Sequence, residues 1–377
     1  MNTLAAMLAC VQGQGETPGR TVIEEPVEDP VIAVSSRCEA LGPSSITGFY
    51  EDNPSYTDEV EELLPSSTPE EQGLDSEVLG GAADELAGEP FAWSLLVLRH
   101  GHVVLEESFN GASQTQSDSI HSASKSMLGL LVGQAIEGGE MELDQPVDEL
   151  LPELFEGLEP GKRDITVEHL LTMSSGLAWT EDETEYEIED EEDWLAAYLA
   201  LPQDHTPGEH FEYSTGSTHL LGAALAHATG WSLCDLAHER LLDPLGAEAE
   251  HWSRDPQGYF SGGYGVAMVP RELARFGQLA LDGGSWEGQQ IVSADWLEAS
   301  HQWHQDAGWG HGYGYLWWLW RPGDHEFAVA WGYGGQLVYL LPEQDIVVVV
   351  TTNTRDYAPD YDAHDLVIEY VLAAVED

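Results

Sequence analysis

Ser122 and Lys125 are the two residues of this chain whose types and spacing best suit covalent catalysis. They open the stretch Ser122–Glu137, which has the apolar pattern of a buried helix, and residues three apart lie on the same face of a helix. A buried lysine can lose its proton and act as a base, whereas arginine keeps its proton in proteins. Only Lys125 and Lys162 are lysines among the 12 basic residues. The pair therefore predicts a serine nucleophile with Lys125 as its base.

A tyrosine and a glycine-rich segment could complete such a site. Tyr213 precedes a predicted helix, Ser217–Gly230, and a phenol beside the serine could pass a proton to a leaving group. The segment Trp331–Gln336 lies between two predicted strands, and its paired glycines allow close approach of a backbone to a ligand. Taken alone, each motif has a plainer interpretation: a chance Ser-x-x-Lys match, a core tyrosine, a glycine-rich hairpin.

The surrounding elements predict one sheet built from both ends of the chain, with a helical lobe inserted between them. A hairpin turn at His100-Gly101 separates the first two strands, and Thr166 is placed to cap a helix. The predicted strands are 93–99, 102–109, 315–320, 326–331, 336–341 and 346–351, and the predicted flanking helices are 76–87 and 363–375.

Three regions follow from the composition along the chain. Residues 1–10 end in Met7-Leu-Ala-Cys10, which resembles a truncated lipoprotein signal, so Cys10 is a candidate lipid anchor and the protein is expected outside the cytoplasm of a bacterium. Residues 11–62 have the composition of an acidic flexible tether. Residues 63–377 form the folded domain, with a sheet lobe at about 63–140 and 260–377 and a helical lobe at about 141–259.

The charge of the chain excludes one class of partner. With 12 basic and 69 acidic residues, the formal net charge is −57, which opposes nucleic-acid binding because that binding requires cations for the phosphates. The acidic run 181–193 is predicted to be a solvated surface loop. Three cysteines make no disulfide framework, and none has the spacing of a metal ligand.

Together, the three short motifs resemble those of serine β-lactamases, penicillin-binding proteins and the class C β-lactamase-related hydrolases. Ser122-Ala-Ser-Lys125, Tyr213-Ser-Thr215 and Tyr333-Gly334-Gly335 occur in the order and rough spacing of that family. The segments 165–176, 270–278 and 283–292 are also similar to it, and the resemblance runs from about Pro69 to about Val371. Within that family, the sequence most resembles the 6-aminohexanoate-dimer hydrolase and esterase branch.

This resemblance implies an α+β fold, a five-stranded antiparallel sheet flanked by helices with an inserted all-helical lobe. It implies Ser122 as nucleophile, Lys125 as base and Tyr213 as proton shuttle. The oxyanion hole would use the backbone N–H groups of Ser122 and Gln336. Thr215, Tyr333, Gly334 and Gly335 would contact the substrate, with no metal or cofactor.

Two departures from the family pattern bear on the substrate. Tyr333 stands where β-lactamases and peptidases carry the lysine that holds a substrate carboxylate, and Thr215 stands where they carry an asparagine. Since the chain as a whole also repels anions, the expected substrate is a neutral or cationic small ester or amide. The alternatives are a β-lactamase or D-alanyl-D-alanine peptidase and, from another class, a non-catalytic binding protein. Trp309, Tyr313, Tyr315, Trp317 and Trp318 are candidates for an acyl pocket.

Overall fold

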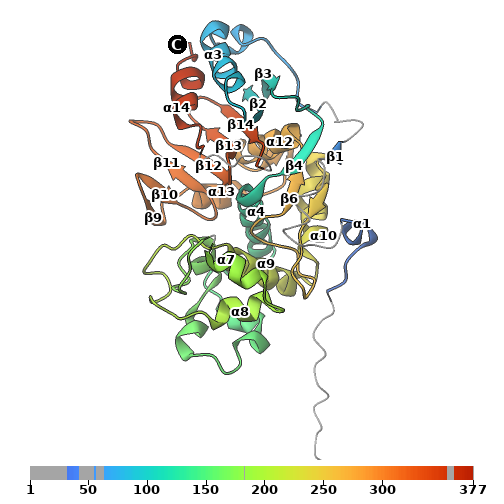
Figure 1. Ribbon diagram of the computed structural model, residues 1–377, viewed down its shortest axis with the longest axis vertical. Coiled ribbons are helices and arrows are strands. Elements are labelled where there is room, and N and C mark those ends of the chain that lie inside the picture. The colour runs from blue at the N-terminus through green and yellow to red at the C-terminus, as the bar shows by residue number, and fades with distance from the viewer. Residues whose placement is uncertain (1–31, 42–54, 57–62, 182, 355–360, 377) are drawn as a thin grey trace, which may run out of the picture. The chain divides into compact units, whose positions relative to one another are not determined.

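The computed structural model describes residues 32–41, 55–56, 63–181, 183–354 and 361–376 (Figure 1). Within this part of the chain no helix has the length and apolarity needed to cross a membrane. The candidate lipid anchor Cys10 lies outside the described residues.

The centre of the fold is an antiparallel sheet of eight strands in the order β3-β2-β14-β13-β12-β11-β10-β9. Its strands are β2 Ala92–Arg99, β3 His102–Ser108, β9 Gln305–Gly308, β10 His311–Tyr313, β11 Trp318–Trp320, β12 Phe327–Gly332, β13 Gln336–Leu341 and β14 Ile346–Thr352. β14 pairs with β2, so both ends of the chain build one sheet, as the sequence predicts. The predicted number of five strands was wrong, in part because the hairpin of β9 and β10 extends the sheet at one edge.

Both faces of the sheet are covered because its central strands carry continuous apolar runs. On β14, Val348 and Val350 face a cluster formed with α3 (Ser76–Ala87), α14 (His364–Leu366) and the π-helical turn Val367–Leu372. Val347 and Val349 face the opposite cluster, toward α12 (Pro270–Leu281) and α4 (Ser124–Glu137). This alternation is the period of two expected of a strand.

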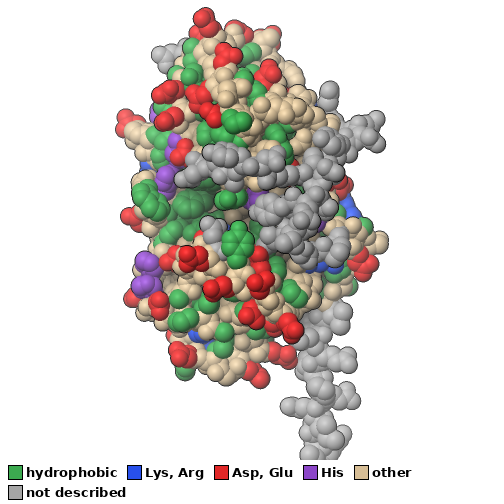
Figure 2. Space-filling view, viewed as in Figure 1, with side chains coloured by type: hydrophobic (Ala, Val, Ile, Leu, Met, Phe, Trp, Pro, Cys, Tyr) green, Lys and Arg blue, Asp and Glu red, His purple; other side chains and the backbone are tan. Residues whose placement is uncertain are grey.

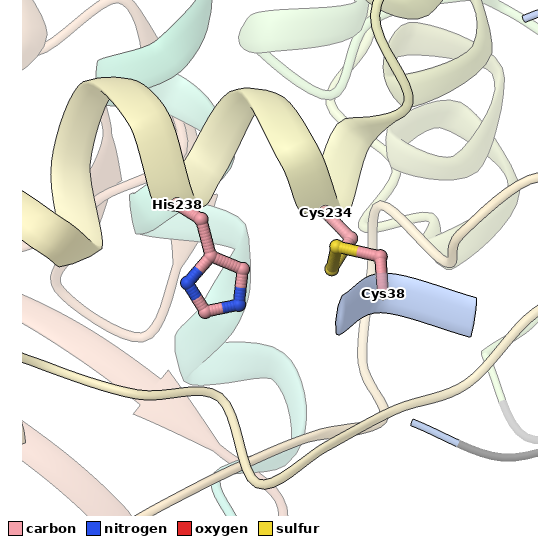
Figure 3. Close-up of side chains that lie close together, drawn as sticks. All are labelled: Cys38, Cys234 and His238. Atoms are coloured by element: carbon pink, nitrogen blue, oxygen red, sulfur yellow. A yellow bond between two sulfur atoms is a disulfide. The ribbon is translucent and has the colours of Figure 1, made fainter. Parts of the chain in front are cut away.

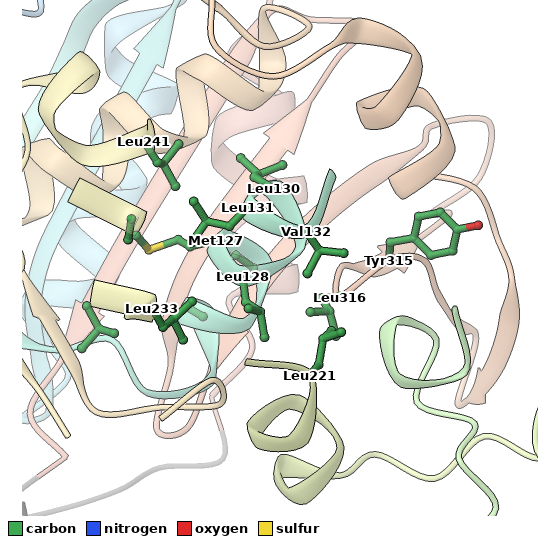
Figure 4. Close-up of a cluster of buried hydrophobic side chains, with 14 of the residues drawn as sticks. Met127, Leu128, Leu130, Leu131, Val132, Leu221, Leu233, Leu241, Tyr315 and Leu316 are labelled. Carbon is green, nitrogen blue, oxygen red and sulfur yellow. The ribbon is translucent and has the colours of Figure 1, made fainter. Parts of the chain in front are cut away.

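Helix α4 is the element shared by the sheet and the helical lobe. Its residues from Ser124 to Gly133 are all buried, which marks a helix surrounded by protein. Figure 4 shows Met127, Leu128 and Leu131 among side chains from the surrounding elements, including Leu221 of α9 (Thr215–Thr229) and Leu233 of α10 (Leu233–Ala237). The first turn of α4 therefore has a fixed position between the two lobes.

The remaining elements are short. The helical lobe contains α5 Val147–Leu150, α6 Val167–Leu171, α7 Glu183–Glu189, α8 Trp194–Ala200 and α11 Asp243–Leu245, the 3-10 turns Pro152–Phe155 and Pro160–Asp164, and the π-helical turn His238–Leu242. Helix α13 is Ala294–Ser300, and a 3-10 turn spans Glu70–Gln72. A small sheet joins β1 Ser55–Tyr56, β4 Gln116–Ser119, β6 Val266–Met268 and β5 His251–Trp252, and β7 Ser285–Trp286 pairs with β8 Gln289–Gln290. Thr166 caps α6 as predicted, accepting a hydrogen bond from the backbone N–H of His169.

A disulfide between Cys38 and Cys234 was not predicted from the sequence. It joins α1 (Ser36–Glu39) to α10 across 196 residues of sequence. Arg37 forms an ion pair of 2.8 Å with Asp243, and Cys38 is fully buried. Of the predicted tether 11–62, the structure describes residues 32–41 and 55–56, and the segment 32–41 is thus fastened to the helical lobe. The pair cannot be recognised from the sequence, because nothing local links residues so far apart.

His238 lies beside this disulfide, as Figure 3 shows. Among the described residues, Cys38, Cys234 and His238 form a group whose ligand atoms lie within 4.8 Å of one another. A structural zinc site requires thiolates, and here both sulfurs are joined to each other. The group is therefore a disulfide with a neighbouring histidine.

Removing the disulfide is expected to lower the free energy of unfolding by about 2–4 kcal/mol, since a cross-link over a long loop restricts the unfolded chain. Urea unfolding of a Cys38→Ser/Cys234→Ser variant measures this difference. Wild-type protein unfolded in the presence of a reductant should match the variant. Equal stability of the oxidised wild type and the variant would show that the disulfide adds nothing.

Candidate active site

Ser122 lies in a 3-10 turn, His121–Ala123, that leads directly into α4. The predicted helix thus begins at Ser124 rather than at Ser122. His121 has a φ of 46°, a left-handed conformation that non-glycine residues rarely adopt. This turn places Ser122, which is partly exposed, at the positive end of the helix and on the wall of a cavity.

Lys125 contacts Ser122 one turn further along, as the spacing predicted. Its Nζ lies 2.7 Å from Ser122 Oγ, 2.9 Å from Thr215 Oγ1 and 2.9 Å from the carbonyl oxygen of Gly263. The side chain is 1% exposed, and this burial lowers the pKa of Lys125, against the opposing charges of Glu181 and Glu185. A lysine in this state can accept the proton of the serine hydroxyl.

Tyr213 completes the group of three side chains. Its phenol is hydrogen-bonded to Ser122, and the centroid of its ring lies 5.0 Å from Lys125 Nζ. Burial raises the pKa of Tyr213, and the charges of Glu181 and Glu185 raise it further. The environment therefore favours a neutral amine on Lys125 and a neutral phenol on Tyr213. This separation makes Lys125 the base and leaves Tyr213 with a proton to donate.

The hairpin of β12 and β13 approaches the nucleophile turn through Gly332. A Cβ atom at this glycine would lie 2.2 Å from the carbonyl oxygen of Ile120 and 3.1 Å from the backbone nitrogen of Ala123. Gly332 is paired with Gln336 across the hairpin. The side-chain amide of Gln336 is used by Thr352, donating bonds of 2.9 Å to its carbonyl and hydroxyl oxygens. Any part that Gln336 plays at the nucleophile must therefore come from its backbone.

The four residues predicted to bind substrate occupy different positions. Tyr333 is 53% exposed and lines the cavity. Gly334 and Gly335, with φ of 75° and 94°, form the turn of the hairpin and are not among the residues that line the cavity. Thr215 is buried and also does not line it; its hydroxyl contacts Lys125 instead. Gly334 and Gly335 are thus placed at the hairpin turn and Thr215 against Lys125, and their contact with substrate stays a prediction.

The acidic run 181–193 is not a solvated loop throughout, which corrects the prediction. Glu181 accepts hydrogen bonds from the hydroxyl and backbone N–H of Thr215 and from Nε1 of Trp179. Glu189 accepts a bond of 2.6 Å from Tyr264, and burial raises the pKa of Glu189 to about 7. In the sequence, only the nearby apolar residues Trp179 and Ile188 indicate that some carboxylates of this run face inward.

The nucleophile opens into a cavity of about 590 Å³, a size suited to a small organic ligand. Its aromatic wall consists of Tyr186, Tyr213, Tyr264, Trp309, Trp318, Trp331 and Tyr333. Glu181, Glu185 and Asp362 also line it, whereas no arginine or lysine is among the described lining residues. Of the predicted pocket aromatics, Trp309 and Trp318 line the cavity. Tyr313, Tyr315 and Trp317 are buried and do not line it, although Tyr313 packs against Tyr213 and Trp318.

Carboxylates also predominate among the charged side chains of the face shown in Figure 2. Figure 2 shows Asp and Glu side chains spread over the described part of this face, with few Lys and Arg side chains among them. The cavity and its surroundings therefore favour cations over anions.

Several known proteins are similar to this chain in sequence. The chain is 27% identical over 289 residues to the 6-aminohexanoate-dimer hydrolase of Paenarthrobacter ureafaciens, covering 70% of this chain and 73% of the relative. It is 27% identical over 278 residues to penicillin-binding protein 4 of Amycolatopsis lactamdurans, covering 62% and 71%. A shorter match, 27% over 174 residues, covers 40% of this chain and 44% of esterase EstB of Burkholderia gladioli.

Solved structures show the same fold. A Bacillus anthracis protein described as a candidate 6-aminohexanoate-dimer hydrolase superposes with a TM-score of 0.70 at 20% identity, covering 85% of this chain and 88% of that one. The octameric penicillin-binding protein homologue of Pyrococcus abyssi gives a TM-score of 0.61 at 21% identity, covering 80% and 78%. The beta-lactamase family model matches residues 71–373, most of the sequence, and the chain therefore belongs to the beta-lactamase family of serine hydrolases.

Proposed function

We propose that this serine hydrolase cleaves small neutral or cationic esters or amides through an acyl-enzyme on Ser122. The observation that carries the proposal is the 2.7 Å contact between Ser122 Oγ and the buried amine of Lys125, at the wall of an acidic and aromatic cavity. The similarity to proteins named 6-aminohexanoate-dimer hydrolase and esterase EstB supports it.

The first half of the reaction forms the acyl-enzyme. Ser122 Oγ attacks the substrate carbonyl carbon while its proton passes to Nζ of Lys125, and the carbonyl π electrons move to the oxygen. We assign the stabilisation of this oxyanion to the backbone N–H groups of Ser122 and Gln336. Tyr213 donates its proton to the leaving alcohol or amine as the ester or amide bond breaks, and the proton on Lys125 replaces it.

The second half regenerates the enzyme. Water attacks the acyl carbonyl carbon and loses a proton to the unit of Lys125 and Tyr213. The bond between Ser122 Oγ and the acyl group breaks, and the returning proton restores the serine hydroxyl.

The acidic lining argues for the proposed substrate class and against β-lactams. A β-lactam antibiotic carries a carboxylate, which Glu181, Glu185 and Asp362 would repel. Tyr333, at the third motif, offers a phenol where β-lactamases place a lysine, so the motif supplies no cation for that carboxylate.

Matched ester substrates test this class. We expect kcat/KM for p-nitrophenyl esters to fall at least about 10-fold when the end of a six-carbon acyl chain changes from a methyl or ammonium group to a carboxylate. The penalty should shrink in molar salt because salt screens the repulsion. Efficient hydrolysis of the anionic ester, or of penicillin in preference to all three esters, would contradict the assignment.

We also propose that the protein works outside the cytoplasm. The Cys38–Cys234 disulfide supports this, since such bonds persist in oxidising compartments. Alkylation and mass analysis of protein taken from its native cells should find both thiols blocked. Free thiols at both positions would overturn the proposal.

A further inference from the structure

The hydroxyl of Thr215 joins Lys125 to Glu181. Thr215 Oγ1 lies 2.9 Å from Lys125 Nζ and donates a hydrogen bond to Oε1 of Glu181. A hydroxyl has one hydrogen, and an ionised carboxylate can only accept. Because that hydrogen points to Glu181, Thr215 can only accept from Lys125.

The second partner of the amine is equally restricted. The carbonyl oxygen of Gly263, 2.9 Å from Nζ, has no hydrogen and must accept. A neutral lysine amine has two hydrogens and one lone pair. With both hydrogens directed to Thr215 and Gly263, the lone pair is directed to the remaining neighbour, Ser122 Oγ at 2.7 Å.

We propose that Glu181, acting through the hydroxyl of Thr215, is a positioning residue that directs the lone pair of Lys125 at the proton of Ser122. Glu181 is itself held in place, because Nε1 of Trp179 donates to its Oε2 at 2.5 Å and the backbone N–H of Thr215 donates at 3.1 Å. This inference rests on the proposed role of Lys125 as base and extends the site to Thr215, the last residue of the second motif, and to Glu181, which lies outside the three motifs.

The same arrangement assists the step that follows. When Nζ takes the proton from Ser122, a positive charge forms on a side chain that is 1% exposed. The carboxylate of Glu181 lies one hydroxyl away and favours that charge. Glu181 therefore both orients the neutral amine and stabilises the ammonium that forms from it.

Other charged groups surround this unit. The charges of Glu181 and Glu185 raise the pKa of Lys125, and the charge of Lys125 lowers the pKa of His121. The charge of Glu181 also raises the pKa of several neighbours: Glu189, Glu212, Tyr198, Tyr213 and Tyr313. A change at Glu181 is therefore expected to alter the titration of Lys125 and of these neighbours together. An experiment that tests the proposal must therefore follow the titration of Lys125 itself.

Because the chain contains only two lysines, the titration of Lys125 can be followed directly. Protein labelled with ¹³C at lysine Cε should show two lysine signals, and a Lys162→Arg variant identifies the signal of Lys125. Since the charge of Glu181 raises the pKa of Lys125, Glu181→Gln should move the titration of this signal to lower pH. An unchanged titration would overturn the electrostatic part of the proposal. This measurement needs no substrate, so it separates the inference from the proposed hydrolase activity.

Thr215 tests the orientation. Thr215→Val keeps the side-chain shape but removes the hydroxyl, and we expect the plateau rate of Ser122 labelling by a fluorophosphonate to fall about 30- to 100-fold. Thr215→Ser restores the hydroxyl and should label within about threefold of wild type. Equal rates for Thr215→Val and wild type, or equal losses in Thr215→Val and Thr215→Ser, would overturn the proposal. Absence of labelling in the wild type would instead refute the proposed function.

Discussion

Replacing Lys125 with arginine is expected to lower kcat by about 10³- to 10⁴-fold, with KM changed by less than about threefold. Arginine retains a positive charge of similar reach but cannot give up its proton. The loss would therefore report the missing base rather than a missing cation. Steady-state hydrolysis of a p-nitrophenyl ester gives both constants.

Lys162→Arg is a matched control for this prediction. Lys162 is the other buried lysine, and its Nζ donates to the carbonyl oxygens of Leu199 and Leu201, far in sequence from Ser122. Its replacement should leave kcat within about twofold of wild type. If Lys125→Arg were as active as Lys162→Arg, Lys125 could not be the base.

The wild-type pH profile follows from the same assignment. Burial lowers the pKa of Lys125, so the neutral amine forms below the pH at which an ordinary lysine loses its proton. As pH rises through this lowered pKa, kcat should increase to a plateau.

Replacing Tyr213 with phenylalanine should lower kcat by about 10²- to 10³-fold because the leaving group loses its proton donor. The effect should be larger for an amide or alkyl ester than for a p-nitrophenyl ester, since nitrophenolate leaves without protonation. Tyr313→Phe is the control, since Tyr313 packs against the ring of Tyr213, with 6.1 Å between centroids, but does not line the cavity.

The dependence of kcat on pH in the alkaline range is a second test of the proton-donating role of Tyr213. Burial and nearby carboxylates raise its pKa, so the phenol keeps its proton beyond the range of an ordinary tyrosine. The plateau of kcat should therefore extend to about pH 10 without a decline. Equal loss for both ester types in Tyr213→Phe, or a decline of kcat near pH 8 in the wild type, would argue against a proton-donating role.

The sequence predicted those parts of the site that residue type and spacing encode. Ser122 and Lys125 are one helical turn apart, so their contact follows from local geometry. Tyr213 and the glycine-rich hairpin were assigned by order and resemblance, and the fold brings both to the nucleophile turn. The apolar runs of β13 and β14 likewise predicted central strands.

The parts that were missed depend on contacts that residue type does not encode. Gly263 contributes a backbone carbonyl, which any residue carries. Glu181 belongs to a run of acidic residues, most of which look alike in sequence, and only the position of Trp179 and Thr215 separates it from the others. Cys38 and Cys234 are 196 residues apart, so only the fold shows that they meet. The β9–β10 hairpin was missed because its residues, such as Gln305 and Asp306, are largely polar.

The central claim, an activated serine at residue 122 whose base is Lys125, is tested most directly by covalent labelling. Folded protein is treated with a fluorophosphonate probe at low and at molar salt, followed by intact-mass analysis and peptide mapping. We expect rapid addition of a single label on Ser122 in the wild type and none in Lys125→Ala on the same time scale. Wild-type protein that stays unlabelled in both salts, or a Lys125→Ala variant that labels as fast as wild type, would contradict the claim.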